Sequence, residues 1–344
     1  MLSPIPLPAN QPTARPDRGG EGIARFRGTP GPADPFTPED FVASTTTVHG
    51  SPDVGLTTLP DGTLLRDAIA ADPVGFLGLE HVERFGADAA LLVKLLHTGE
   101  RLFVHAHPGD DFARSELHEP HGKTEAWIVV DAENDEQAAV AWLGFTRDVT
   151  TAEIERWYSS QDAAAMLAAM HRVTLRPGDT LLVPAGLPHA IGPGLTLVEL
   201  QQPVDLSLIL EYVGYPGLTA DNALLGLSLT ETLPALRTAA LSEDELASLR
   251  GSTSATDGPI APLLPMAADP FFAADALTPS PELQLAPRLS ILVVTEGSGT
   301  LTWSDGQLGL ARGMTVLIPH GAGLTTLAGE LTAIRARPAP PAAD

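Results

Sequence analysis

Short runs of β-branched and aliphatic residues, broken by Gly, Pro, Asp and Asn, recur along most of the chain. Runs of this length and spacing predict the strands of a sandwich or barrel, not the strand–helix alternation of a parallel sheet. In the first part of the chain we expect strands at 89–96, 101–107, 125–131, 138–144, 171–175, 180–184, 195–201 and 206–213. The Asp-Gly pair in LPDGT, at 59–63, is typical of a tight hairpin.

Helical patterns interrupt these strands at two places. Residues 150–170, TTAEIERWYSSQDAAAMLAAM, begin with threonines that can cap a helix and with acids that a helix dipole favours. Ser242 followed by Glu245 has the capping-box spacing and predicts a second helix that ends near residue 250. We expect both helices to be small insertions in an all-β unit.

The β pattern returns after a stretch rich in Gly, Ser and Pro. GMTVLIP at 313–319 repeats GDTLLVP at 178–184, so two related barrels are the simplest interpretation. The expected boundaries are 1–21 for a flexible Pro-rich arm, 22–250 for the first barrel with helical inserts at about 150–170 and 240–250, 251–270 for a linker, 271–337 for the second barrel and 338–344 for a tail.

Composition narrows the possible partners. The 344 residues include 43 acidic and 20 basic ones, for a net charge of −23, and no cysteine. Nucleic-acid binding depends on Lys and Arg that displace counterions, and thiolate sites and disulfides need cysteine. No run approaches the roughly 20 apolar residues of a membrane span, and the first 20 residues lack the apolar core of a secretory signal. We expect a cytoplasmic protein without nucleic-acid, membrane or protein partners.

Three segments carry residues suited to a metal ion. In HAHP, at 105–108, strand alternation puts His105 and His107 on one face. His189 follows a strand that stops at a Pro-x-Gly turn, and Glu125 opens an apolar strand where a hydrophobic residue would be expected. Nitrogen and oxygen donors without sulfur suit Zn, Mn, Fe, Co or Ni, and a cation would offset the cost of burying Glu125. We therefore expect one divalent ion held by these four residues.

Four motifs, HAHPGDDFA, GKTEAW, LRPGDTLLVPAGLPHAIGPG and LVELQQPVD, resemble in order those of the class I mannose-6-phosphate isomerases, metal-dependent enzymes of the cupin superfamily. The resemblance covers residues 20–337 and implies a double cupin, in which the second jelly-roll barrel has no metal site. It implies that His107, Glu125 and His189 are ligands. His105 stands where the family usually has Gln, and imidazole there favours a borderline metal such as Zn.

Two departures from the family bear on the substrate. Phe103 replaces a serine two residues before the first ligand, and Ile209 replaces an arginine four residues after Asp205. Neither side chain can hydrogen-bond a phosphate oxygen. Four basic residues are candidates to replace the missing arginine: Arg25, Arg27, Lys94 and Arg101.

The reaction implied is the isomerisation of mannose 6-phosphate to fructose 6-phosphate, in which a proton moves between C1 and C2 through an enediol. Glu199 shares a strand face with Leu197 and Gln201, which should raise its pKa and make it the general base; the alternative is a structural buried acid. Lys123 would stabilise an oxyanion or a phosphate, and Asp205 borders the site in relatives.

Two other functions stay open at this point. An isomerase of a non-phosphorylated sugar would keep the metal and the barrel and would fit Phe103 and Ile209. A non-catalytic cupin would bind a metal or a sugar without turnover. In each case the partner is a small sugar or sugar phosphate.

Overall fold

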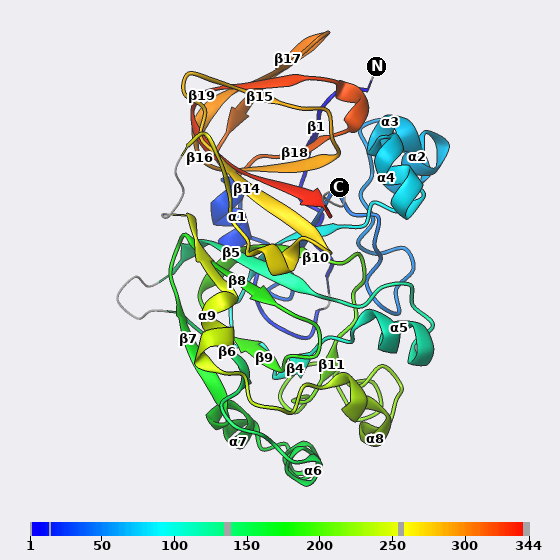
Figure 1. The fold of residues 1–344 in the computed structure, drawn as a ribbon, viewed down its shortest axis with the longest axis vertical. Helices are drawn as coiled ribbons and strands as arrows, with labels where there is room; N and C mark the ends of the chain where they lie inside the picture. The colour runs from blue at the N-terminus through cyan, green and yellow to red at the C-terminus, as the bar shows by residue number, and fades with distance from the viewer. Residues whose placement is uncertain (1, 14, 134–138, 254–257, 340–344) are drawn as a thin grey trace.

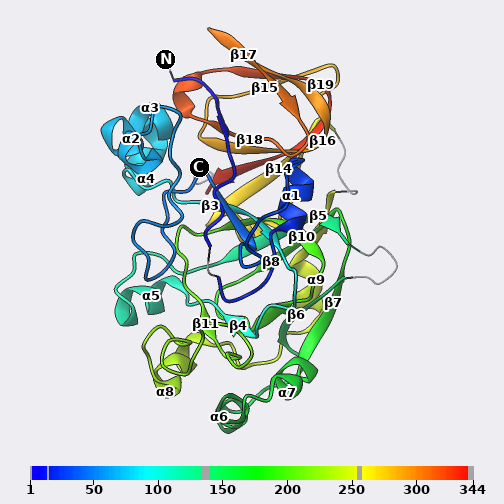
Figure 2. The same ribbon diagram turned by 180° about the vertical axis from the view of Figure 1, so that it is seen from behind.

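A computed structural model of the chain describes residues 2–13, 15–133, 139–253 and 258–339. Two β-rich units are stacked along the long axis of the molecule, and short helices lie along their sides (Figure 1) (Figure 2). The expected fold class, mainly β with small helical insertions, is confirmed. Among the described helices, none combines the length and the apolar character needed to cross a bilayer.

The first barrel, residues 39–252, consists of two antiparallel sheets that face one another. Trp127 and Leu197 of the larger sheet share one buried apolar cluster with Leu143 and Val173 of the smaller sheet. The larger sheet has the order β12 (Arg250–Ser252), β8 (Asp179–Val183), β5 (Glu125–Ala132), β10 (Leu195–Gln201), β3 (Leu92–His97) and β2 (Glu39–Val42). The smaller sheet has the order β11 (Leu208–Ile209), β4 (His105–Ala106), β9 (His189–Ile191), β6 (Ala139–Phe145) and β7 (Met170–Leu175).

The eight strands expected in this barrel are all present, but two are much shorter. The segment 101–107 contains only the two residues of β4, and 206–213 only the two of β11. The strand β9 was not expected, because it has three residues and directly follows a turn. Residue 138 of one expected strand lies outside the described residues. Strands of two or three residues are too short to show an alternating pattern.

The expected helices are confirmed, together with their caps. The insertion forms α6 (Thr151–Ser160) and α7 (Ala163–Ala168), and Thr150 and Glu153 make a reciprocal capping box. Ser242 caps α9 (Glu243–Ser248) in the same way. Two further short helices complete this barrel: α5 (Asp110–Glu116) and α8 (Leu229–Thr232).

The expected hairpin at 59–63 is wrong. Gly62 has a φ of 88° and makes a turn, but only a single Thr58–Leu64 bridge closes it. The chain then enters three helices that were not predicted, α2 (Leu65–Ala71), α3 (Pro73–Leu77) and α4 (Leu79–Phe85). Each has five to seven residues, which is too few for a helical period to stand out from the sequence.

The second barrel, residues 258–339 with β1, is built on one eight-stranded sheet. Its strands are β1 (Ile5–Leu7), β13 (Ile260–Pro262), β14 (Phe272–Leu277), β15 (Glu282–Leu285), β16 (Ser290–Trp303), β17 (Gly306–Ala311), β18 (Thr315–Ile318) and β19 (Thr325–Pro338). The long strands β16 and β19 pair along most of their length. They curl around a buried apolar cluster that includes Leu292, Leu301 and Leu327.

The structure differs from the expected domain boundaries at the arm and at the linker. Ile5–Leu7 pairs with β18, so the segment 1–21 is not a free arm, and α1 (Glu21–Arg27) follows it directly. Of the expected linker 251–270, β12 extends the first barrel and β13 the second, while residues 254–257 lie outside the described residues.

One apolar cluster extends across the boundary between the barrels. It contains Phe26 and Val93 from the first part of the chain and Phe272 and Ile291 from the second barrel. The barrels therefore pack as one body. Their division at 22–250 and 271–337 stays a prediction, as does a separate tail at 338–344, because β19 continues to Pro338 and residues 340–344 lie outside the described part.

Candidate active site

Three histidines converge inside the first barrel. His105 on β4 lies directly opposite His189 on β9, with ring centroids 4.0 Å apart. His107 follows β4, and its ring lies 4.9 Å from each of the other two. One nitrogen from each of the three imidazoles lies within 4.8 Å of the others, and all three side chains are buried. The structure therefore brings together the three histidines expected from the sequence.

Backbone carbonyls fix which nitrogen of each ring faces this centre. Nδ1 lies 2.9 Å from Phe103 O in His105, 2.7 Å from Leu206 O in His107 and 2.8 Å from Leu187 O in His189. A carbonyl oxygen only accepts, so each Nδ1 carries the proton and each Nε2 keeps its lone pair. Three lone pairs held in this way are suited to a metal ion.

Glu125, at the start of β5, completes the cluster. Its carboxylate oxygens lie 3.0 Å from His107 Nε2 and 3.3 Å from His189 Nε2. Trp127 Nε1 donates a 3.0 Å hydrogen bond to Glu125 Oε1, which fixes the orientation of the carboxylate. Glu125 thus lies with the three histidines, as the sequence predicts for a shared site.

Two glycine turns bring these segments together. Gly186, with a φ of 86°, donates to the carbonyl of His107 over 2.8 Å and so ties the turn before His189 to the histidine loop. Gly122 approaches the same loop so closely that a Cβ would lie 2.5 Å from the backbone nitrogen of Asp110. Only glycine fits there, and the next residue is Lys123.

Lys123 places its ammonium between two lone pairs. Its Nζ lies 2.9 Å from Glu125 Oε2 and 3.2 Å from His107 Nε2. A cation at this point stabilises two acceptors that would otherwise repel one another. Burial followed by the Lys123 charge lowers the pKa of His107 to about 4, which keeps its ring neutral.

Three buried atoms at the centre are poorly satisfied among the described residues: His189 Nε2 and Glu199 Oε1 have no hydrogen-bond partner, and Glu125 Oε2 has only its ion pair with Lys123 and the contact with His107. Buried acceptors without partners are costly in a folded protein. Two of these three atoms belong to the His–Glu cluster, so the donor set fits a divalent cation. His105, His107 and His189 could hold such an ion.

Glu199 on β10 lies beside the cluster, opposite Trp127 on one neighbouring strand and Lys94 on the other. Its carboxylate is 3.6 Å from Lys123 Nζ and buried. Burial, followed by the Glu125 charge, raises the pKa of Glu199 to about 7, against the opposing effect of Lys123. This is the raised acid that the sequence pattern predicts.

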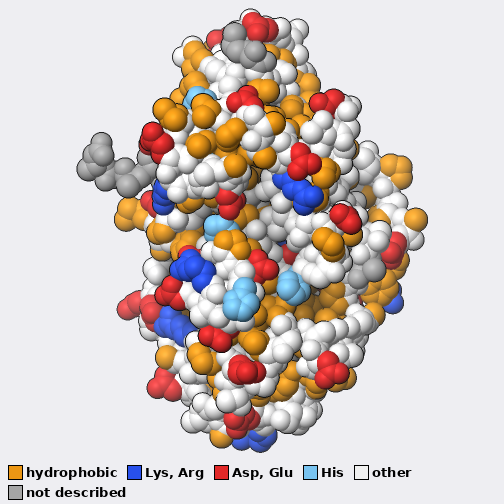
Figure 3. All heavy atoms as spheres, turned by 90° about the vertical axis from the view of Figure 1, so that its right-hand side faces the viewer, with side chains coloured by type: hydrophobic (Ala, Val, Ile, Leu, Met, Phe, Trp, Pro, Cys, Tyr) orange, Lys and Arg blue, Asp and Glu red, His pale blue; other side chains and the backbone are white. Residues whose placement is uncertain are grey.

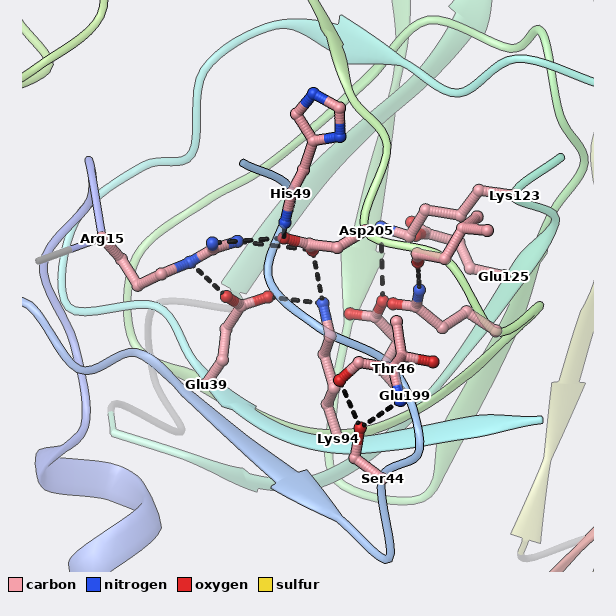
Figure 4. A network of polar contacts seen from close by, with 12 residues as sticks. Arg15, Glu39, Ser44, Thr46, His49, Lys94, Lys123, Glu125, Glu199 and Asp205 are labelled. Atoms are coloured by element: carbon pink, nitrogen blue, oxygen red, sulfur yellow. Dashed lines mark hydrogen bonds and ion pairs between the residues drawn. The ribbon is translucent and has the colours of Figure 1, made fainter. Parts of the chain in front are cut away.

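A second network of buried charges adjoins Glu199 (Figure 4). Arg15 and Lys94 each contact both Glu39 and Asp205, with Lys94 Nζ 2.7 Å from Glu39 and 3.2 Å from Asp205. The backbone nitrogen of His49 also donates to Asp205. Arg15 and Lys94 hold the pKa of Asp205 well below its usual range despite its burial.

These groups line a cavity of about 50 Å³. Its walls include Arg15 and Asp17 from the N-terminal segment, together with Lys123, Glu199 and Asp205. Asp205 also borders a wider groove of about 470 Å³ formed by residues 45–52 and 203–206 with Glu119. On the face drawn in Figure 3, acidic, basic and histidine side chains are interspersed, and no broad basic patch is visible.

Sequence reasoning missed three residues of the cavity wall, Arg15, Asp17 and Glu39. The first two lie in the segment expected to be free, and no local pattern marks any of them. Lys94 was noticed, because a charge inside an apolar strand is unusual.

None of the four candidate cations is an unpaired replacement for the missing arginine. Lys94 is bound by Glu39 and Asp205, and Arg27 pairs with Asp40. The other two pairings place Arg25 on Asp131 and Glu133, and Arg101 on Glu211.

Comparison with known proteins shows similarity along most of the chain. No protein-family model matches it. It is 27% identical over 247 residues to mannose-6-phosphate isomerase ManA of Bacillus subtilis, across 70% of this chain and 72% of the relative. The mannose-6-phosphate isomerase of Streptococcus mutans is 33% identical over 138 residues, across 39% of this chain and 41% of that protein. Over about two thirds or more of its length the chain is thus similar to proteins named mannose-6-phosphate isomerase: 70% for ManA and 74% for the B. subtilis protein YvyI, named as a putative mannose-6-phosphate isomerase.

Solved phosphomannose isomerases share the whole fold. The B. subtilis mannose 6-phosphate isomerase matches 98% of this chain and 100% of its own, with a TM-score of 0.75 and 22% identity. A point mutant of the Salmonella typhimurium phosphomannose isomerase matches the same shares with a TM-score of 0.74 and 16% identity. The double-cupin architecture expected from the motifs is confirmed.

The two departures from the phosphomannose isomerase motifs lie in one apolar cluster. Phe103 packs with Ile209 and Ala223, and Tyr215 meets the Phe103 ring edge-on at 5.2 Å. Phe103 also contacts the His105 ring, at 5.0 Å, and lines the cavity. The wall next to the first histidine is therefore apolar.

Proposed function

We propose that the protein is a metal-dependent aldose–ketose isomerase, related to the enzymes that convert mannose 6-phosphate to fructose 6-phosphate, and that it moves a proton between C1 and C2 of its sugar. The observation that carries this proposal is the convergence of three buried imidazoles, two of them in contact with Glu125, beside a buried acid and a buried lysine. The similarity to enzymes named mannose-6-phosphate isomerase supports the same reaction. The ligand is then a small sugar or sugar phosphate, and a cytoplasmic location stays part of the proposal.

We assign His105, His107, His189 and Glu125 as the metal ligands and Zn as the metal, because nitrogen and carboxylate donors without sulfur suit it. A divalent cation bound there would polarise the sugar carbonyl and stabilise the negative charge of the enediol state. The Nδ1 hydrogen bonds keep the three rings in their binding tautomer.

Proton transfer is assigned to Glu199. Its carboxylate is buried on the cavity wall, and one of its oxygens lacks a hydrogen-bond donor among the described residues. An acid in this state can accept the proton from one carbon and return it to the other. Lys123, 3.6 Å away, neutralises the charge that develops on the sugar oxygens.

Asp205 is assigned an indirect role in the reaction. Its oxygens are ion-paired with Arg15 and Lys94, and its pKa is held well below the usual range, so it does not exchange protons. We assign it to positioning the cations of the wall and not to the chemical step.

The test is a His189→Ala variant compared with a His118→Asn control, whose histidine lies exposed outside the site. Metal content is measured after reconstitution with Zn²⁺, and exchange of the C2 proton is followed with mannose and with mannose 6-phosphate. We expect His189→Ala to lose both metal and exchange, and His118→Asn to keep both. Full metal in His189→Ala would contradict the ligand assignment. Metal and sugar binding by the wild type without exchange would identify a non-catalytic cupin.

A further inference from the structure

The charges around the cavity bear on the substrate of the proposed isomerase, so this inference rests on that function. We propose that the cavity accepts a neutral aldose and rejects its phosphate ester. Three features carry the proposal: the pairing of every described basic side chain at the cavity, the apolar wall beside His105, and the groove outside.

The basic side chains in and behind the wall are matched by carboxylates. Arg15 and Lys94 share Glu39 and Asp205 between them. Lys123 is paired with Glu125 and has Glu199 at 3.6 Å. Asp17 adds one further acid to the wall. A bound divalent ion would bring these charges close to balance, so the pairing of each base, and not an excess of acids, is what leaves the described part of the cavity without an unpaired side-chain cation for a phosphate.

The wall beside His105 supplies no anion donor either. Phe103, Ile209 and Ala223 form its apolar cluster. Arg101 lies close in sequence, but Glu211 holds it in a bidentate pair, with Nη1 2.7 Å from Oε2, and the same carboxylate accepts from Val104 N at 3.0 Å. The Arg101 guanidinium is therefore already paired with the Glu211 carboxylate.

The outer groove would be the remaining place for a phosphate on a sugar bound in the cavity. Its described lining contains Glu119 and Asp205, three threonines and His49, but neither Lys nor Arg. Hydroxyl and backbone donors can bind an anion, yet here they lie between two acids. The described lining of the groove therefore supplies no Lys or Arg to a phosphate.

A phosphate dianion gives up much of its hydration on entering a protein and needs charged donors to replace it. Here each cation would first have to break its ion pair with a carboxylate. That carboxylate would then be buried without a partner, which costs free energy. A neutral sugar needs only hydroxyl partners, and carboxylates are good acceptors for sugar hydroxyl groups. The charge pattern thus favours the neutral substrate.

The primary test compares kcat/KM of the Zn²⁺-reconstituted protein for mannose, lyxose and mannose 6-phosphate. We expect a neutral aldose to be preferred by at least about 100-fold, because no unpaired Lys or Arg of the described lining can replace the hydration of the phosphate. A preference for mannose 6-phosphate would overturn this inference and leave the isomerase function standing. Turnover of none of the three would instead count against the proposed function.

A variant pair tests the cause. Glu39→Gln leaves Arg15 and Lys94 with one carboxylate between them, so we expect the preference for the neutral aldose to fall by about tenfold. Glu83→Gln, an exposed acid on α4, should leave the ratio unchanged. Thermal melting checks that both variants fold. If Glu39→Gln does not fold, Asp17→Asn is measured in its place, with the same direction expected. An unchanged ratio in a folded wall variant would overturn the charge-pairing account.

Discussion

The two barrels use the same antiparallel strands around very different interiors. In the first barrel, the strands bury His105, His107, His189, Glu125 and Glu199 around a cavity. In the described part of the second barrel, the cluster between β16 and β19 is apolar. The charged group Asp275 is neutralised there by Arg335 and Arg337, 2.7 and 2.8 Å away.

This difference shows what the strand pattern decides and what it leaves open. Alternation determines which residues face inward in both barrels. Whether the inward face becomes a core or a site depends on whether its polar atoms find partners. In the first barrel His189 Nε2 and Glu199 Oε1 do not, whereas in the described part of the second barrel Arg337 Nε alone does not, which supports the proposed site in the first barrel. The second barrel acts as its support through the shared apolar cluster.

The difference between the two barrels is tested most strongly at Glu199, where we expect the largest effect. If it is the proton carrier, Glu199→Gln should lower kcat by about 10³-fold, since an amide cannot accept the proton. Metal content and melting temperature should stay near wild type, because Glu199 is not among the assigned ligands. Activity above a tenth of wild type would make Glu199 a structural buried acid.

The second barrel should respond in stability and not in chemistry. Leu327 is fully buried in its apolar cluster, so Leu327→Ala should cost about 3 kcal/mol of unfolding free energy. Denaturant unfolding measures that loss. The amount of divalent metal taken up per folded molecule on reconstitution should be unchanged at low temperature. Loss of metal uptake in the folded variant would show that packing in the second barrel affects the proposed metal site in the first.

The smallest expected effect is the pH dependence of the metal-free protein. The pKa of His107 is lowered from 6.5 to about 4 by burial and by Lys123, so the unfolded chain binds a proton there that the folded chain does not. Stability should therefore fall as the pH drops from about 6.5 to 4 and be complete above that window. We expect a decrease of about 5 °C in melting temperature. A His107→Gln variant should show a shallower slope, and an equal slope would assign the effect to other groups.

The sequence predicts that His105, His107, His189 and Glu125 lie together because much of the relevant geometry is local. The H-x-H spacing orients His105 and His107, and the Pro-x-Gly turn places His189 at a strand end. These are features that a motif carries within a few residues.

The charge network could not be predicted in this way. Arg15 meets Asp205 across 190 positions, and Lys94 meets Glu39 across 55. No periodic signal links such pairs, and a Pro-rich start is typical of a free arm. The strand β1 has only three residues, which is too few to be recognised as a strand from the sequence alone.

The N-terminal segment has a practical consequence. Leu7 belongs to the edge strand on β18, while Arg15 closes the cavity of the other barrel. Proteolytic cleavage between Leu7 and Arg15 would leave β1 paired with β18 in the second barrel. Arg15 would then no longer be connected to β1 through the chain. A version of the chain shortened past residue 15 would lose the Arg15 guanidinium from the cavity wall while keeping the cluster of His105, His107 and His189.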